Sequence, residues 1–548
     1  MRILVQLIGS TATTVSLYGL YVLFDYIKFL VNSTIKDLSG PSNGHLLWGN
    51  LKEIIATDGM VHEKWAEEYG RTLKYRWIFG VRVVLDFGYA SMVQLMFMLC
   101  FQLDHLHTMD TKALSHILTN HPIYQKPEMV RYNLTQILGA GLLVTEGDKH
   151  SVQRKIMNPA FGPSQIRELT EIFVDKSVEL KDVWTSQVVA GGGVARIDVL
   201  SSLSQMTLDV IGLAGFNYKF NSLSGEPNEL NKAFSTLFGN PQVKLWPIAQ
   251  LLIPILRNLP SWDPPLEQAK NTMDRIGRNL LDESKASLRG NGEKAGASRD
   301  LLSLLVKSNV GGERMSDEDI IAQVPTFLVA GHETTSTATT WALYALVRKP
   351  EIQRKLREEL YTLSSDTPDM DELNSLPYLD HVVRETLRVH APVTSTSRVA
   401  TKDDIIPLGT PFVDRKGVTR DSVSIQKGQT IIIPIAALNR DKSLWGEDAV
   451  EFKPERWDKL PEAVTSIPGV WGNLMTFLGG PRACIGYRFS LAEMKALLFI
   501  LVRNFEFELA VPPEDITTKT TLVQRPRLKS DDDAGSQLPL LVKLYQGA

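Results

Sequence analysis

Cysteine is scarce in this chain, which has only Cys100 and Cys484 among its 548 residues. Two cysteines exclude a framework of several disulfides, and they exclude zinc or iron–sulfur sites built from several cysteines. Charge of one sign is also lacking, because 59 Lys and Arg oppose 62 Asp and Glu and give a net charge of −3. This balance gives no reason to expect nucleic acid as a partner.

The chain also lacks internal repeats and any long linker rich in proline, serine or glycine. Its length alone suggests about two to four domains. Since no linker divides it, a single large domain is an equally open interpretation. Hydrophobic residues make up 43% and charged residues 22%, which is ordinary for a globular protein with a large packed core.

The amino end has a long uncharged run. Residues 3–24 carry no charged side chain and are flanked by Arg2 and Asp25. A helix of that length reaches about 33 Å, enough to cross the hydrocarbon core of a bilayer. A cleaved signal peptide is the alternative, but no convincing small-x-small cleavage site precedes Asp25. We therefore expect a retained membrane anchor over residues 1–31 and a catalytic domain over residues 32–548.

The rest of the chain is predicted to be mainly α with small β-sheets. Apolar residues at spacings of three and four predict helices around 61–70, 163–187, 201–213, 265–288 and 351–364. Strand-like runs occur at 72–76, 394–400 and 428–434.

One helix is expected to be long, at about 32 residues. Ser316 followed by three acidic residues is typical of a helix start, and the segment 348–350 (Arg-Lys-Pro) is typical of a helix end. Pro325 should bend this helix without ending it. Residues 330–335 (Ala-Gly-His-Glu-Thr-Thr) form a polar cluster in its apolar middle, and such a cluster is costly to bury unless it is satisfied or used.

Residues 477–486 read Phe-Leu-Gly-Gly-Pro-Arg-Ala-Cys-Ile-Gly. Gly480 and Gly486 would let the backbone run close to a flat cofactor, and Arg482 could pair with an acidic group on it. An amphipathic helix follows and directs its positive end toward the Cys484 sulfur, which favours the thiolate form that binds metals. A structural cysteine in a glycine-rich turn is the alternative.

The same residues resemble a known family. Phe477, Gly480, Arg482, Cys484 and Gly486 match the haem-binding signature F-x-x-G-x-R-x-C-x-G of the cytochrome P-450 superfamily. Further motifs of that family occur in order, namely A-G-x-E-T-T at 330–335, E-x-x-R at 385–388 and P-E-R-W at 454–457. The chain is similar to fungal microsomal members over about residues 40–548. This resemblance implies the cytochrome P-450 fold, with one large domain behind an N-terminal membrane anchor.

The resemblance implies that haem b is bound through the Cys484 thiolate. The predicted haem-binding residues are Cys484, Arg482, Phe477, Gly480, Gly486, Arg398, His150, Arg154 and Ala330. Among these, Arg398, His150 and Arg154 resemble the family's propionate contacts, and His150 stands where tryptophan is usual. Taken singly, His150 and Arg154 would be read as surface residues.

Glu385, Arg388 and Arg456 resemble the family's buried charged triad. Without the resemblance, Glu385 and Arg388 would be read as an exposed pair on a helix.

Glu333 and Thr334 are the predicted catalytic residues. Thr334 can donate back to the Ala330 carbonyl, which loosens the helix and leaves room for water, and Gly331 would allow close approach to dioxygen. The resemblance implies that Glu333 and Thr334 then deliver protons. A threonine-rich segment that only packs is the alternative, but it does not explain an acid in mid-helix. The pair favours a monooxygenase over a haem-thiolate isomerase or dehydratase, and over a non-catalytic haem sensor or scaffold.

The resemblance implies insertion of one oxygen atom of O2 into a lipophilic, terpenoid-like substrate, with xenobiotic or fatty-acid hydroxylation as an alternative. Electrons would come from NADPH through the flavoprotein cytochrome P-450 reductase. The expected location is the endoplasmic reticulum membrane, single-pass, with a cytosolic catalytic domain. Residues 245–256, apolar and broken by two prolines, would form either the substrate entry at the membrane or a buried core segment.

Residues 83–104 depart from the family pattern. They interrupt an expected β-hairpin, and residues 87–103 carry no charge. The segment is either a second membrane-dipping element, an apolar lid, or a translated intron or similar gene-model error. The absence of turn chemistry favours the error.

Overall fold

The computed structural model describes residues 31–42, 49–57, 60–77, 104–225, 228–230, 232–233, 264–289, 300–309, 315–531 and 533–546, with a few single residues near the amino end. Two compact units are distinguished within the chain. Unit 1 comprises residues 1–133, 241–264 and 395–437, and unit 2 comprises residues 134–240, 265–394 and 438–548. The expected division into an anchor and one catalytic domain stays a prediction, since the anchor lies almost wholly outside the described residues.

Unit 1 is built on a five-stranded sheet with the order β1-β2-β8-β5-β3. Its strands are β1 (Thr72–Arg76), β2 (Asp104–Thr108), β8 (Thr430–Ile433), β5 (Thr396–Ala400) and β3 (Tyr124–Gln125). The predicted strands near 72–76, 394–400 and 428–434 are therefore confirmed. Unit 1 also contains α2 (Leu51–Ala56), α3 (Val61–Tyr69), α5 (Thr111–Thr119) and the hairpin of β6 (Asp404–Val413) with β7 (Thr419–Ile425).

Strands β1 and β2 pair antiparallel in continuous register, from Thr72 opposite Thr108 to Arg76 opposite Asp104. The Asp104 carboxylate accepts from Lys74 Nζ at 2.8 Å and from Arg76 Nε at 3.2 Å. Asp104, the last residue of the expected insert, is the first residue of β2. Residues 83–103 lie outside the described residues, as do residues 245–256, so both expectations stay predictions.

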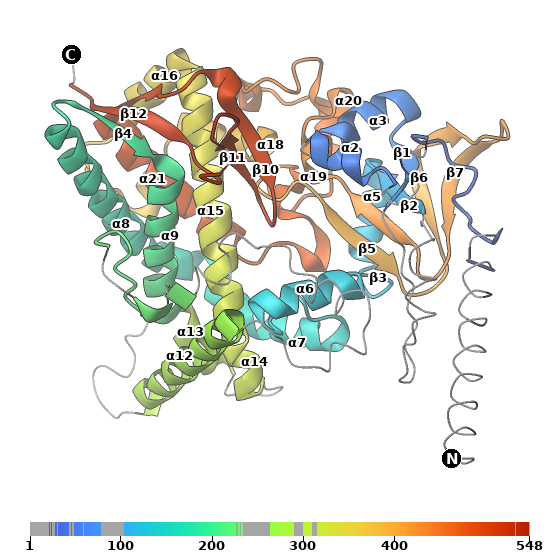
Figure 1. Ribbon diagram of the computed structural model, residues 1–548, viewed down its shortest axis with the longest axis horizontal. Helices are drawn as coiled ribbons and strands as arrows, with labels where there is room; N and C mark the ends of the chain where they lie inside the picture. Colours follow the sequence, from blue (N-terminus) through green and yellow to red (C-terminus); the bar gives the residue numbers. More distant parts are fainter. Residues whose placement is uncertain are drawn as a thin grey trace, which may run out of the picture. The chain divides into compact units, whose positions relative to one another are not determined.

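Unit 2 is mainly helical. Its longer helices are α7 (Gly147–Met157), α8 (Pro163–Ala190), α9 (Val199–Phe216), α12 (Pro264–Arg289, whose first residue belongs to unit 1), α13 (Leu301–Ser308), α15 (Gln323–Arg348), α16 (Pro350–Leu360), α18 (Pro377–Val389) and α21 (Tyr487–Asn504). Helix α15 packs against α9, and α21 packs against α8 and α15. Figure 1 shows α15 in yellow running beside α9 in green. The helices predicted around 163–187, 201–213, 265–288 and 351–364 are confirmed to within a few residues.

Short elements complete unit 2. They are η1 (Asn158–Phe161), α14 (Asp317–Ile321), α17 (Met370–Asn374), α20 (Lys442–Trp445), η3 (Pro454–Asp458), η4 (Glu462–Ser466), η5 (Met475–Phe477), η6 (Gly480–Arg482) and η7 (Pro513–Asp515). A three-stranded sheet has the order β4-β12-β9, from β4 (Val194–Asp198), β12 (Pro539–Leu544) and β9 (Phe505–Leu509). Strands β10 (Ile516–Thr520) and β11 (Gln524–Leu528) form a hairpin. Helices α6 (Glu128–Leu138) and α19 (Ile435–Asn439) contain residues of both units.

The expected long helix is two helices. Ser316 caps α14 by accepting from the Asp319 N–H at 3.1 Å, as the sequence predicts, but the helix ends at Ile321 and α15 begins at Gln323. The prediction of one helix bent at Pro325 is therefore wrong. Proline has no N–H to donate to the residue-321 carbonyl, and its ring is accommodated best in a first helical turn. Pro325 thus lies in the first turn of α15.

Among the described residues, α9 is the helix long and apolar enough to cross a membrane by length and composition. It is mostly buried within unit 2, as expected for a core helix. Gly331 of α15 explains part of this close packing, since a Cβ there would lie 2.9 Å from Ile211 Cδ1 of α9. Gly331 therefore lets the two helices approach each other.

Candidate active site

The turn before Cys484 has a backbone that few residues other than glycine can adopt. Leu478 and Gly480 have φ angles of 55° and 66°, and any side chain at Gly479 would collide with the Pro468 carbonyl oxygen. The Cys484 N–H then donates to the Phe477 carbonyl oxygen at 2.8 Å. This bond closes the turn and fixes the direction of the cysteine just before α21 begins.

The Cys484 side chain is exposed and is not in a disulfide, although protein surrounds it closely. Desolvation raises the pKa of its thiol, and a backbone hydrogen bond from Gly486 and the charge of Arg154 act in the opposite direction. The sequence predicts positive potential at this sulfur, and the structure supplies it, but burial has the larger effect. A bound metal cation would reverse that balance and favour the thiolate.

Two arginines connect the turn to α7 and to the residues just before it. Arg154 Nη1 donates to the Ala483 carbonyl at 2.6 Å, and Arg482 Nη1 donates to the Thr145 carbonyl at 2.7 Å. Arg482 also forms an ion pair with Glu146, and both side chains are almost fully buried. His150 lies buried on the same helix. Glu146 was not predicted from the sequence, although its place directly before a helix with two predicted site residues was a usable signal.

Helix α15 is open at one place only over residues 326–343. Ala330 is exposed and Gly331 and Thr334 are partly exposed, while the other residues of this stretch are buried. Thr334 Oγ1 donates to the Ala330 carbonyl at 2.7 Å, as the sequence predicts. Because this opening has small and hydroxyl-bearing residues, it can accept a flat ligand and water.

The open part of α15 lies close to the cysteine turn through two contacts. Thr335 Oγ1 donates to Ser490 Oγ of α21 at 3.1 Å. Phe161 packs edge-on against Phe327, with ring centroids 5.5 Å apart, and a Cβ on Gly486 would lie 3.8 Å from the Phe161 ring. Cys484 and the α15 opening therefore belong to one region of unit 2.

Glu333 is placed differently from its neighbour Thr334. Its side chain is buried and forms an ion pair with Arg525 of β11, and its Oε1 lies 3.7 Å from His332 Nδ1. The His332 Nε2 is 2.7 Å from Ser204 Oγ of α9. Burial and the charge of Arg525 lower the pKa of His332 to about 3, so this imidazole is neutral at physiological pH. Arg525 lies in no motif that would have predicted this contact from the sequence.

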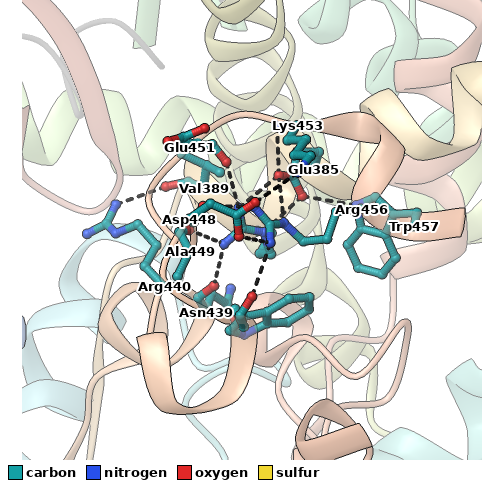
Figure 2. A network of polar contacts seen from close by, with 12 residues as sticks. Glu385, Val389, Asn439, Arg440, Asp448, Ala449, Glu451, Lys453, Arg456 and Trp457 are labelled. Atoms are coloured by element: carbon teal, nitrogen blue, oxygen red, sulfur yellow. Dashed lines mark hydrogen bonds and ion pairs between the residues drawn. The ribbon is translucent and has the colours of Figure 1, made fainter. Parts of the chain in front are cut away.

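Glu385 and Arg456 lie together in a buried network (Figure 2), and Arg388 pairs with Glu385 in the same network. Arg388 Nε and Nη2 each donate to a Glu385 oxygen at 2.8 Å, and Arg456 Nε donates to Glu385 Oε1 at 3.3 Å. Trp457, the last residue of the P-E-R-W motif, bonds Glu385, and Asp448, which was not predicted from the sequence, bonds Arg456. Glu385 and Arg388 have no exposed surface, which excludes an exposed helix pair.

The remaining predicted residues are Phe477 and Arg398. Phe477 is buried, and its ring lies 5.8 Å from that of Trp471 and 6.0 Å from that of Tyr487. Arg398 belongs to unit 1, where it lies buried on β5 and donates to the Ser397 carbonyl at 2.7 Å.

The residues around Cys484 suit a metal that is bound within an organic cofactor. Among the described residues, no three His, Cys, Asp or Glu side chains are grouped so as to hold a metal ion. A metal bound by Cys484 alone therefore needs a group that supplies its other ligands. The glycine turn, the open part of α15 and the nearby arginines suit a flat, anionic group of this kind.

Comparison with known proteins identifies a family model and several relatives that match this chain. The family model for cytochrome P450 matches residues 91–530. Cytochrome P450 monooxygenase 205 of Postia placenta is 53% identical, over 100% of this chain and 98% of that protein. Cytochrome P450 monooxygenase 128 of the same fungus is 50% identical, over 98% and 97%. A ganoderic acid synthetase of Ganoderma lucidum is 33% identical, over 95% and 97%.

Proposed function

The chain belongs to the cytochrome P450 family and is a monooxygenase, and we propose that it takes electrons from NADPH through a flavoprotein reductase to oxidise a lipophilic, terpenoid-like secondary metabolite. The observation that carries this proposal is the Cys484 thiol, exposed and fixed in its turn by the 2.8 Å bond to Phe477. Family members use haem iron, which supplies the centre at which dioxygen is activated.

We assign the haem-binding roles to residues on both sides of this thiol. Cys484 would bind the iron as a thiolate, and haem ligated in this way would supply the oxygen-activating chemistry. Phe477, Gly480, Gly486 and Ala330 would contact the haem ring. Its carboxylates would be bound by Arg482, Arg154, His150 and Arg398. Arg482 already has Glu146 as a partner, so this pair would rearrange or share the arginine when haem binds.

The proton-handling role belongs to Thr334 and Glu333. Thr334 holds its hydroxyl at the open part of α15 by donating to the Ala330 carbonyl, which weakens the local helix bonding and leaves room for water. Glu333, the adjacent acid, would supply the protons that the Thr334 hydroxyl passes on. This acid–alcohol pair favours a monooxygenase over an isomerase or a dehydratase, which need no protons from solvent for oxygen activation.

Support for the substrate class comes from one relative, which is named a ganoderic acid synthetase. Xenobiotic or fatty-acid hydroxylation is the alternative. The test is co-expression with a fungal cytochrome P450 reductase in cells fed terpenes, sterols and fatty acids, followed by mass analysis. A terpenoid product 16 Da heavier, dependent on NADPH, supports the proposal, and oxidation of fatty acids alone would contradict it.

Membrane attachment through residues 3–24 and a cytosolic domain complete the proposal. Tyr21 and Phe24 are exposed apolar side chains in the described part of this region, which is expected of a segment in contact with lipid. The exposed Asn133 stands in an Asn-Leu-Thr sequon. We expect membrane-bound enzyme without a glycan at Asn133, whereas a glycan there would place the domain in the lumen.

A further inference from the structure

Arg384 of α18 lies close to two tryptophan rings. Its guanidinium carbon is 4.6 Å from the centroid of the Trp471 ring and 5.4 Å from that of the Trp457 ring, and both distances are within the range of a cation–π attraction. Trp457 is fixed independently, because its Nε1 donates to Glu385 Oε2 at 3.0 Å in the network of Figure 2. Through Arg384, Trp471 is therefore connected to a ring whose position is already determined.

The position of the Arg384 cation is also determined by its surroundings. Its Nε donates to Asp380 Oδ2 at 2.5 Å, and Asp380 Oδ1 lies 2.8 Å from Lys495 Nζ of α21. Gly472, directly after Trp471, has a φ of 59°, and a Cβ there would lie only 2.9 Å from Arg384 Nη1. The carboxylate thus holds the guanidinium, and the glycine leaves room for it beside the Trp471 ring.

Trp471 leads from Arg384 to the cysteine turn. Its ring packs edge-on against Phe477, with centroids 5.8 Å apart, and its neighbour Val470 donates its N–H to the Leu478 carbonyl at 2.8 Å. Phe477 in turn accepts the Cys484 N–H at 2.8 Å. Since Trp471 is partly exposed and Phe477 is buried, the indole covers part of the residue that holds the cysteine backbone.

We propose that Arg384 is a positioning residue for Cys484, which holds Trp471 against Phe477 and thereby keeps water away from the cysteine sulfur. This inference rests on the proposed binding of haem iron by Cys484. The apolar shell around a metal site controls solvent access and, with it, the reduction potential. Water that reaches the sulfur donates hydrogen bonds to the thiolate and weakens its electron donation, so the reduction potential rises.

The direct effect of the Arg384 charge has the opposite sign. A nearby positive charge favours the addition of an electron, so its removal alone would lower the reduction potential. Loss of Trp471 would leave that charge in place and would expose only Phe477 and the turn. The direction of the change in potential therefore distinguishes an action through Trp471 from an action through charge.

The test measures the reduction potential of the full-length, haem-loaded protein by spectroelectrochemistry, without turnover. We expect Arg384→Met and Trp471→Leu each to raise the potential, and the double variant to raise it no further than Trp471→Leu does. Arg384→Lys should stay close to wild type, because an ammonium group can also lie over an indole ring. Arg348→Met is the matched control, since Arg348 lies 5.9 Å from the Tyr344 ring centroid at the exposed end of α15, and it should leave the potential unchanged.

The second measurement is the rate at which the reduced carbon-monoxide complex loses its red-shifted band at fixed pH. Loss of one cation–π contact should speed this decay about two- to thirtyfold in Arg384→Met, with Arg384→Lys restoring most of the wild-type lifetime. An unchanged potential in Arg384→Met and Trp471→Leu would overturn the inference.

The double variant tests the route. A potential that falls in Arg384→Met, or shifts that add in the double variant, would show that Arg384 acts without Trp471 and would overturn the positioning role. Wild-type protein without a thiolate-bound haem would contradict the proposed function itself, and the inference with it. Bound haem with unmoved potentials would overturn the inference alone.

Discussion

Glu385 and Arg388, three residues apart on α18, form an ion pair with no exposed surface in which two arginine nitrogens bond the two carboxylate oxygens at 2.8 Å each. Arg388 also donates to backbone carbonyls of Asn439 and Glu451 at 3.0 and 2.9 Å. The pair therefore connects α18 to the segment that leads toward the cysteine turn. The pair holds these segments in place but adds little net stability, because the cost of burying two charges offsets most of their attraction.

Glu385→Gln should strongly destabilise the protein. The change leaves Arg388 buried without its carboxylate, and breaking a buried pair from one side costs about 3–5 kcal/mol. The measurement is the free energy of unfolding of the haem-loaded protein in urea. Glu358→Gln is the matched control, because Glu358 pairs with Arg354 at 4.0 Å on the exposed face of α16, where such pairs contribute about 0–1 kcal/mol. Equal losses in the two variants would contradict the buried role.

Arg154→Met should weaken haem retention. The variant loses the 2.6 Å bond to the Ala483 carbonyl and the positive charge that lowers the pKa of the Cys484 thiol. A charged hydrogen bond contributes about 1.5–3 kcal/mol, which corresponds to about ten- to hundredfold in affinity. The rate of haem transfer to apomyoglobin measures the effect. Lys155→Met, at the exposed next position of α7, is the control and should transfer haem at the wild-type rate. If Arg154→Met also transfers haem as slowly as wild type, the contact is dispensable.

Thr334→Ala should keep haem binding and lose coupling. The alanine cannot hold a hydroxyl at the α15 opening, and acid–base steps commonly contribute about 10²–10⁴ in rate. Product per NADPH is therefore expected to fall at least about tenfold while hydrogen peroxide rises. Thr340→Ala removes a similar bond, from Thr340 Oγ1 to the Ser336 carbonyl at 2.7 Å, in the buried part of α15. That control should stay coupled, and tight coupling in Thr334→Ala would exclude the proposed role.

Much of the secondary structure could be predicted from local patterns. The strand at 72–76 and the cap at Ser316 depend on neighbouring residues, so sequence periodicity and capping rules identify them. The break at Ala322 was missed because a proline is compatible either with a bend inside a helix or with a first turn. The next helix, not the local sequence, decides between them.

The site was less predictable wherever partners are distant in the chain. Cys484, Arg482 and Thr334 belong to motifs that are read from a few adjacent residues. Arg525 and Glu146 pair with residues far along the sequence, and single arginines or glutamates are usually surface residues. Neither ion pair has a local sequence pattern, so both can be identified only in the folded chain.

Acid should destabilise unit 1 through its buried histidines. The His62 and His107 rings stack with centroids 5.0 Å apart, burial lowers the pKa of His62 to about 4, and burial lowers the pKa of His107 well below its usual 6.5. The unfolded chain takes up these protons near pH 6.5 and the folded chain does not. Stability is therefore full above pH 6.5 and falls as pH drops toward 4, by about 3 kcal/mol for His62 alone.

His107→Leu should reduce this acid sensitivity. Neither His107 ring nitrogen has a hydrogen-bond partner among the described residues, so leucine removes a titrating group without leaving an unpaired one. Unfolding free energies between pH 7 and pH 4 measure the slope. A variant with the wild-type slope would show that His107 contributes nothing to acid unfolding.

The most direct test of the central claim is the carbon-monoxide difference spectrum of the reduced protein. Wild-type protein expressed with haem should show the red-shifted band of a thiolate-bound haem, and Cys484→Ala should lose that band while Glu358→Gln keeps it. A band that persists in Cys484→Ala, or wild-type protein that takes up no haem, would contradict ligation of the iron by Cys484.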